Sequence, residues 1–252
     1  MVTKIKKNQI IFAATILITL VAFLANLSLI SCNNIEKNTD ETDKYTEFRN
    51  NMVDYQIIAR GITDKKVIDT MRKVPRHEFV DQSLKDSAYT DHPLSIGMGQ
   101  TISQPYVVAL MTESLELTGS ERALEIGTGS GYQAAILSEI VKEVYTVEII
   151  TVLHQKSNIA LSEYPNVKTS NHDGYYGWEE YAPFDRIIVT AAPDHIPQPL
   201  VEQLADGGIM VIPVGPPGWN QVLWKVEKKD GEVITTKITD YVAFVPLTRD
   251  IK

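Results

Sequence analysis

A glycine-rich turn constrains the fold of this chain more than any other feature. The stretch "ALEIGTGSGYQAA" places Gly127, Gly129 and Gly131 between a short apolar strand and a helix. Glycine adopts positive φ without strain and lets backbone N–H groups approach a ligand closely. Glu148 closes the next predicted strand about 20 residues after Gly127, where a doubly wound sheet places a carboxylate against ribose hydroxyls. The turn therefore predicts a nucleotide-type ligand.

Strands and helices alternate beyond Gly119. We expect strands at 122–126, 143–149, 167–174, 184–192 and 209–215, with helices at 132–141, 151–164 and 199–208, the last ended by glycine. Residues 221–238 read as two strands joined by a Lys-Asp-Gly turn, and 241–247 close the chain. The pattern predicts an α/β fold: a doubly wound, mostly parallel, Rossmann-like sheet with helices on both faces and antiparallel C-terminal strands.

The residues before this alternation form two short helices and a loop. Residues 48–62 have apolar residues at helical spacing, with Gly61 placed to end the helix. Thr63 is a candidate cap for a second helix, which Pro75 stops. Residues 77–103 look loop-rich. Ser103, just before Gln104 and Pro105, suits the N-cap of the helix that follows.

The spacing of the turn helps to choose between two ligands. A dinucleotide fingerprint is G-x-G-x-x-G, whereas this turn is G-x-G-x-G. Glu125 adds a carboxylate that suits the cationic methionine portion of S-adenosylmethionine and would repel a pyrophosphate. We therefore favour S-adenosylmethionine. Asp173 follows the third strand of the alternation and either bonds an adenine amino group or forms an Asp-Gly turn.

Composition excludes several functions. The net charge is −8, and because Lys4, Lys6 and Lys7 precede every acidic residue, the rest of the chain is more acidic still. No basic cluster is available for nucleic acid. Cys32 is the only cysteine, so no intramolecular disulfide forms, and the five histidines are too scattered to indicate a metal site.

The first 32 residues read as a targeting segment. "MVTKIKK" is basic, residues 10–30 are apolar, and Leu29-Ile30-Ser31-Cys32 resembles a bacterial lipobox in which Cys32 is lipidated. The apolar run is also long enough to span a bilayer uncut. Residues 33–44 are polar and form a tether, and residues 45–252 form the folded domain.

Taken together, the motifs resemble the protein-L-isoaspartate (D-aspartate) O-methyltransferase family, a class I S-adenosylmethionine-dependent fold. The resemblance covers roughly residues 45 to 250, and "GQTISQPY" is its most specific part. It is carried by residues 74–80, 93–115, 123–137, 144–149, 172–178, 182–208, 211–215 and 244–248.

The resemblance implies a repair reaction. The family methylates the α-carboxylate of L-isoaspartyl residues in damaged proteins, and the ester then cyclises to a succinimide that partly returns to aspartate. Ser103 falls at the catalytic serine and would hold the carboxylate. A nucleophilic serine is not indicated, because Ser103 lacks a G-x-S-x-G elbow. Cofactor-binding residues carried over are Gln100, Thr101, Ile102, Gly127, Thr128, Gly129, Glu148, Asp173, Gly174 and Thr248.

Two other functions stay open at this point. One is a nicotinamide-dependent oxidoreductase on the same fold, and the other is a lipid-anchored binding protein without catalysis. We expect isoaspartyl proteins as partners, a membrane contact through the N-terminal segment, and a monomer. The family is generally cytosolic, so the signal predicts either an exported, anchored enzyme or, as the alternative, a cytoplasmic one.

Overall fold

The computed structural model describes residues 44–216 and 220–249, and the compact unit considered below begins at Phe48. The predicted signal segment (1–32) and residues 33–43 of the predicted tether lie outside this description. Within the described ranges, no helix is both long and apolar enough to cross a membrane.

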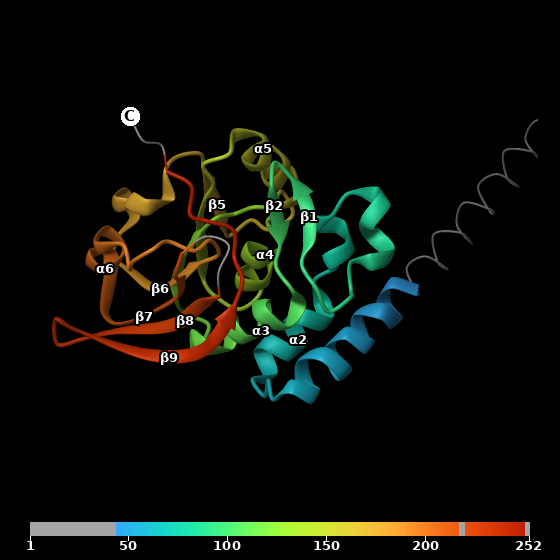
Figure 1. Ribbon diagram of the computed structural model, residues 1–252, viewed down its shortest axis with the longest axis horizontal. Coiled ribbons are helices and arrows are strands. Elements are labelled where there is room, and N and C mark those ends of the chain that lie inside the picture. The colour runs from blue at the N-terminus through green and yellow to red at the C-terminus, as the bar shows by residue number, and fades with distance from the viewer. Residues whose placement is uncertain (1–43, 217–219, 250–252) are drawn as a thin grey trace, which may run out of the picture. The chain divides into compact units, whose positions relative to one another are not determined.

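One mixed sheet forms the centre of the unit. Its described strands, in order across the sheet, are β5 (Val167–Ser170), β4 (Glu143–Val147), β3 (Arg122–Ile126), β6 (Phe184–Val189), β7 (Leu204–Val214), β8 (Gln221–Lys229) and β9 (Glu232–Val242) (Figure 1). Strands β3 to β7 pair in parallel, whereas β8 and β9 continue the sheet antiparallel. This confirms the predicted mostly parallel sheet with antiparallel C-terminal strands.

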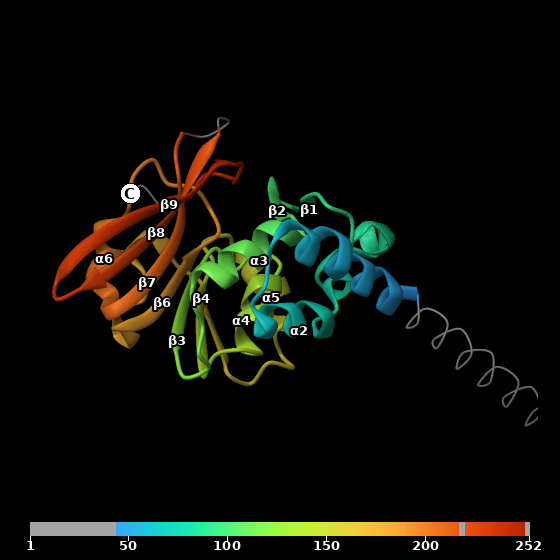
Figure 2. The same ribbon diagram turned by 90° about the horizontal axis from the view of Figure 1, so that it is seen from below.

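The chain winds outward from β3 in two directions. Helices α4 (Tyr132–Ser138) and α5 (Thr151–Ala160) lead from β3 to β4 and on to β5, after which the chain crosses back to β6 and reaches β7 through α6 (Gln198–Gln203). Right-handed crossovers in opposite directions place α4 and α5 on one face and α6 on the other (Figure 2). The strand order reverses between β3 and β6, which is where such sheets bind ligands.

Burial explains why these segments become strands. In β3 and β4 every residue after the first is buried, as expected of central parallel strands covered on both faces. The core beneath the sheet includes Leu124, Tyr145, Phe184 and Met210. This apolar centre holds the carboxyl ends of the parallel strands in a fixed arrangement.

Local capping chemistry shapes the N-terminal helices. Helical residues 48–52 run into η1 (Val53–Ile57) and η2 (Ile58–Arg60), and the helix ends at Gly61, whose φ is 95°. The predicted Thr63 cap is wrong: Asp64 caps α2 (Lys65–Lys73), and its carboxylate accepts from the backbone N–H groups of Lys66 and Val67. The Thr63 N–H instead donates to Glu113 at 2.7 Å.

The loop predicted at 77–103 is mostly ordered structure. It contains η3 (Arg76–Phe79), η4 (Gln82–Ser87) and an antiparallel hairpin of β1 (Leu94–Gly97) and β2 (Gln100–Ile102). The hairpin tip, Gly97-Met98-Gly99, has positive φ throughout. Helix α3 (Pro105–Ser114) follows directly. Two glycines made the strands look irregular in the sequence.

The C-terminal part gives one correction and one confirmation. The glycine stop predicted after α6 is wrong, because β7 begins at Leu204 and runs through Gly207 and Gly208. The predicted turn between β8 and β9 is confirmed, with positive φ at Asp230 and Gly231.

Candidate active site

The predicted site residues gather at the carboxyl edge of the parallel strands, in two adjoining pockets. The first, which we call the serine pocket, is lined by Ser103, Glu125, Thr128, Tyr132 and Gln133 among others. The second, the Glu148 pocket, is lined by Gln100, Glu148, Gly174 and the segment Val245–Thr248 among others. Both include Thr101, Gly127, Gly129 and Thr190, so they share a wall.

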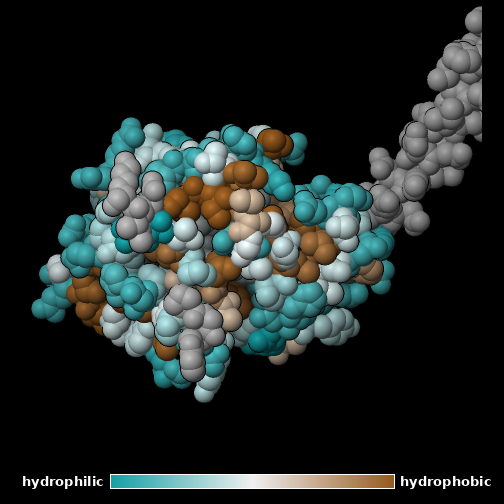
Figure 3. Space-filling model, turned by 45° about the horizontal axis from the view of Figure 1, so that its top comes forward, coloured by the Kyte–Doolittle hydropathy of each residue, from teal (hydrophilic) through white to brown (hydrophobic). Residues whose placement is uncertain are grey.

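A space-filling view gives the surface character of the unit. Apolar surface gathers near the middle of the face shown and is ringed by polar surface (Figure 3). Apolar patches with polar rims are typical of binding sites on soluble proteins.

Gly127 directly follows β3, at the point where the strand order reverses between β3 and β6. Its φ is 96°, and a Cβ there would lie 2.5 Å from the hydroxyl oxygen of Thr190. That hydroxyl donates to the carbonyls of Ile126 and Gly127, at 3.0 and 2.6 Å. Only glycine fits between the ends of β3 and β6, and its absent side chain leaves the turn's backbone open to a ligand.

Glu148 ties the glycine turn to the next strand. One carboxylate oxygen accepts from the Gly129 N–H and the other from the Ile150 N–H, both at 2.8 Å. The residue is 5% exposed and lines the Glu148 pocket. Because each carboxylate oxygen accepts more than one hydrogen bond, the group can still receive two hydroxyls from a ribose.

Asp173 has a structural role in this structure. One carboxylate oxygen accepts from the Tyr175 N–H at 3.0 Å and caps η5 (Gly174–Tyr176), and the other pairs with Arg249 at 3.0 Å. Gly174, not Asp173, lines the Glu148 pocket, and a Cβ on Gly174 would lie 2.6 Å from Ile126. Both Asp173 oxygens thus have partners in the structure, as the turn alternative predicted, and the contact of Asp173 with adenine stays a prediction.

The C-terminal segment closes one side of the Glu148 pocket. The Ala192 N–H donates to the Val245 carbonyl at 2.8 Å, and the Leu247 N–H donates to the Ala192 carbonyl at 2.9 Å. The Arg249 guanidinium lies 3.5 Å from the centre of the Tyr175 ring. Thr248 follows these contacts and lines the pocket, and its contact with the cofactor, which the resemblance implies, stays a prediction.

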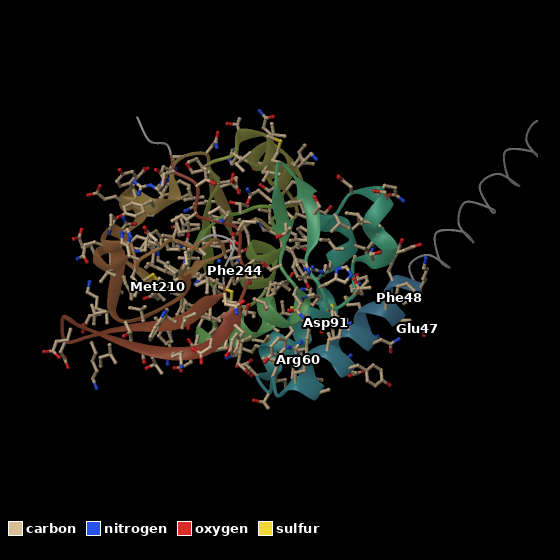
Figure 4. The ribbon with its side chains drawn as sticks, viewed as in Figure 1. Glu47, Phe48, Arg60, Asp91, Met210 and Phe244 are labelled. Carbon is tan, nitrogen blue, oxygen red and sulfur yellow. The ribbon has the colours of Figure 1, made fainter. Side chains whose placement is uncertain are left out.

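Ser103 is not the helix cap that the sequence suggested. Gln104 is the N-cap of α3 with Pro105 at the first helical position, and no side chain caps the helix. The Gln104 amide instead donates to Asp91 at 2.8 Å, and Asp91 pairs with Arg60 at 3.1 Å (Figure 4). The Ser103 hydroxyl makes no hydrogen bond within the described part of the chain, and the residue lines the serine pocket. Its hydroxyl is therefore available to a ligand.

Glu125 is a fully buried carboxyl group at the floor of the serine pocket. One oxygen accepts from the Thr146 hydroxyl at 2.5 Å, while the other has no hydrogen-bond partner among the described residues. Burial raises the pKa of Glu125 to about 8. An unpartnered, buried carboxyl oxygen beside a pocket suits a cationic group.

The structure thus brings together all but one of the predicted site residues. Those that line the two pockets are Gln100, Thr101, Ile102, Ser103, Gly127, Thr128, Gly129, Glu148, Gly174 and Thr248. Sequence reasoning missed Tyr132, Gln133 and Thr190. Thr190 lies inside the predicted strand 184–192, and only the observed end of β6 at Val189 places it at the carboxyl edge of the sheet. Tyr132 and Gln133 lie on α4, whose sequence does not show which side faces the pocket.

Comparisons with known proteins agree on one family. The sequence model of the family described as "Protein-L-isoaspartate(D-aspartate) O-methyltransferase (PCMT)" matches residues 47–252 of this chain. A protein-L-isoaspartate O-methyltransferase 2 of Shewanella sediminis is 53% identical over 83% of this chain and 86% of its own. One from Picosynechococcus is 52% identical over 81% of this chain and 92% of its own.

A solved structure extends the similarity to three dimensions. It is a protein-L-isoaspartate O-methyltransferase of Plasmodium falciparum in complex with S-adenosyl-L-homocysteine. The TM-score is 0.70 at 28% identity, over 80% of this chain and 99% of the other. The pockets described above therefore lie on a scaffold similar to one that holds a nucleoside thioether.

Proposed function

This chain belongs to the protein-L-isoaspartate (D-aspartate) O-methyltransferase family, and we propose from that membership that it transfers a methyl group from S-adenosylmethionine to the α-carboxylate of L-isoaspartyl residues in damaged proteins. The single observation that carries the proposal is the shared wall between the serine pocket and the Glu148 pocket. A carboxylate held at Ser103 would lie next to a methyl donor that extends from the Glu148 pocket past this wall to Glu125. Neither alternative, the oxidoreductase or the inactive binding protein, gains support from the named relatives.

The residues present fit the cofactor. Glu148 would hold the ribose, Gly174 and Thr248 would border the adenine, and the unpartnered oxygen of Glu125 would face the methionine ammonium. S-adenosylmethionine, when bound, supplies a methyl group that is already activated by its sulfonium. The protein therefore has no leaving group to activate.

The remaining work of the protein is orientation. The substrate carboxylate has a pKa near 4 and is ionised at neutral pH, so no general base is required. The Ser103 hydroxyl would donate to one carboxylate oxygen, and the N-terminus of α3 adds partial positive charge. Alignment of reacting groups with exclusion of water can supply about 7–11 kcal/mol.

Methyl transfer to matched peptides tests this function. With labelled S-adenosylmethionine, we expect label in a peptide that contains L-isoaspartate and none in the same peptide with normal aspartate. The two peptides have the same composition, so only the placement of the carboxylate differs. Equal labelling of both, or labelling of neither, would reject the proposed reaction.

We also propose that the enzyme is a monomer that is exported and anchored to a membrane through lipidated Cys32. The support is the basic start, the apolar run and the lipobox-like Leu29-Ile30-Ser31-Cys32, together with the tendency of positive charges before such a run to leave the following domain outside.

Replacing Cys32 tests the anchor. Cys32→Ser in cells is expected to abolish lipid attachment and cleavage and so to change the gel mobility, while the uncut apolar run can still hold the protein in the membrane fraction. Ser31→Ala, which keeps a small residue before the cut site, is expected to behave as the wild type. Unchanged mobility of Cys32→Ser would contradict lipidation.

A further inference from the structure

A fully buried arginine lies directly behind the serine pocket. Arg76 is 0% exposed. Its Nε donates to the Ala88 carbonyl at 2.7 Å and one terminal nitrogen donates to the Ser103 carbonyl at 2.6 Å. Both acceptors are neutral backbone groups. The guanidinium thus holds the backbone of Ser103 in position.

The charge of Arg76 has no counter-ion in the described part of the chain. No carboxylate pairs with it, and its second terminal nitrogen is buried without a hydrogen-bond partner. Burial lowers the pKa of Arg76 to about 10, so the group is still protonated at neutral pH. An unpaired buried cation opposes folding. A neutral side chain could also donate hydrogen bonds to these two backbone carbonyls, so the hydrogen bonds do not explain why the buried group is charged.

The charge of Arg76 lies next to two residues of the serine pocket. The guanidinium contacts Ser103 and lies 4.9 Å from the centre of the Tyr132 ring, and both residues line the serine pocket. Arg76 does not line the pocket itself, and the cation contacts the wall of the pocket through these two residues. Interactions between charges are strong across such a dry, weakly polarisable layer.

We propose that Arg76 is a positioning residue that holds Ser103 through its carbonyl and supplies the positive charge that selects an anionic isoaspartyl carboxylate over a neutral group of the same shape. This inference rests on the proposed function, because it assumes that the carboxylate binds at Ser103. Beyond that function, the buried guanidinium of Arg76 would be the source of the selectivity for a charged ligand. Selection by charge would favour the free acid over its methyl ester product.

Two peptide ligands separate charge from shape. One contains L-isoaspartate, and the other carries a carboxamide in place of the α-carboxylate. Binding of each is measured with S-adenosylhomocysteine present, so that no transfer occurs. In Arg76→Gln we expect affinity for the carboxylate peptide to fall about tenfold or more, and that for the carboxamide peptide to change by less than about threefold. S-adenosylhomocysteine should bind within about threefold of wild type.

Two variants serve as controls. Arg186 also donates to backbone carbonyls, those of Leu115 and Glu116 at 2.6 and 3.2 Å, but lines neither pocket. Arg186→Gln is expected to leave the preference for the carboxylate unchanged. Arg76→Lys keeps the charge and is expected to retain most of that preference.

The wild type gives a readout that does not depend on folding of a variant. Because the charge is buried, the preference for the carboxylate peptide should change less than about twofold up to about 0.5 M salt. The inference would be overturned if salt removed the preference for the carboxylate peptide. It would also be overturned if Arg76→Gln lost affinity for both peptides equally. If the wild type methylates the isoaspartyl peptide in either case, the proposed function stands while this inference fails.

Discussion

Replacing Ser103 with alanine is expected to lower kcat/KM for an isoaspartyl peptide about 10- to 150-fold, because a hydrogen bond to a charged group contributes about 1.5–3 kcal/mol. The affinity for S-adenosylmethionine should stay within about threefold. Ser103 is assigned to the substrate carboxylate, whereas the proposed cofactor contacts fall to Glu125, Glu148, Gly174 and Thr248, so the loss should fall on the peptide and not on the cofactor. Steady-state kinetics with varied peptide, together with direct cofactor binding, measure both effects.

Ser95 provides a matched control for this change. It lies on β1 of the hairpin that directly precedes Ser103, is exposed, and lines neither pocket. Ser95→Ala should therefore leave turnover unchanged. A loss of cofactor affinity as large as the loss of rate in Ser103→Ala would assign Ser103 to cofactor binding or to folding instead.

The second large effect concerns Glu125. Since burial raises its pKa to about 8, the carboxyl is protonated in the free enzyme at about pH 6.5. A methionine ammonium beside it favours the ionised form, so binding of S-adenosylhomocysteine should release close to one proton. Wild-type affinity should accordingly rise about tenfold per pH unit between about pH 6 and 7.5.

Glu125→Gln should remove this linkage. We expect almost no proton release, an affinity independent of pH in the same interval, and a loss of affinity that approaches about 30-fold near pH 7.5, because the buried ion pair is gone. Calorimetry in buffers of different ionisation enthalpy measures the protons released.

Glu121 is the control for Glu125. Hydrogen bonds from Thr118 and Gly119 outweigh its burial and lower its pKa to about 2. Glu121 is therefore ionised throughout, and Glu121→Gln should leave proton release unchanged. Proton release that persists in Glu125→Gln would show that another group faces the ammonium.

The sequence predicted most of the central sheet because its signals are local. The apolar residues of β3 and β6 and the glycine turn after β3 are each contiguous in the chain. The β8–β9 turn was equally readable, because Asp-Gly at 230–231 favours positive φ. Such features depend on residues within a few positions of one another, which single-sequence patterns capture.

The errors arose where a distant partner decides the local structure. Ser103 suited a cap by composition, but Gln104 takes the cap position because Asp91 holds its amide and Arg76 holds the Ser103 carbonyl. For Asp173 the sequence offered a ligand contact or an Asp-Gly turn, and only the structure shows that Arg249 pairs with its carboxylate. No pattern near either residue indicates these partners.

The sequence by itself determined the class of fold, the family, and the residues at the ends of the parallel strands, because sheet topology and glycine turns follow from short-range preferences. Only the tertiary structure decided which groups have no partner. Among the described residues, it leaves the Ser103 hydroxyl and one oxygen of Glu125 without a hydrogen-bond partner, and it buries the charge of Arg76 without a counter-ion. Burial and pairing depend on segments far apart in the chain, and they set how strongly each group can act on a ligand.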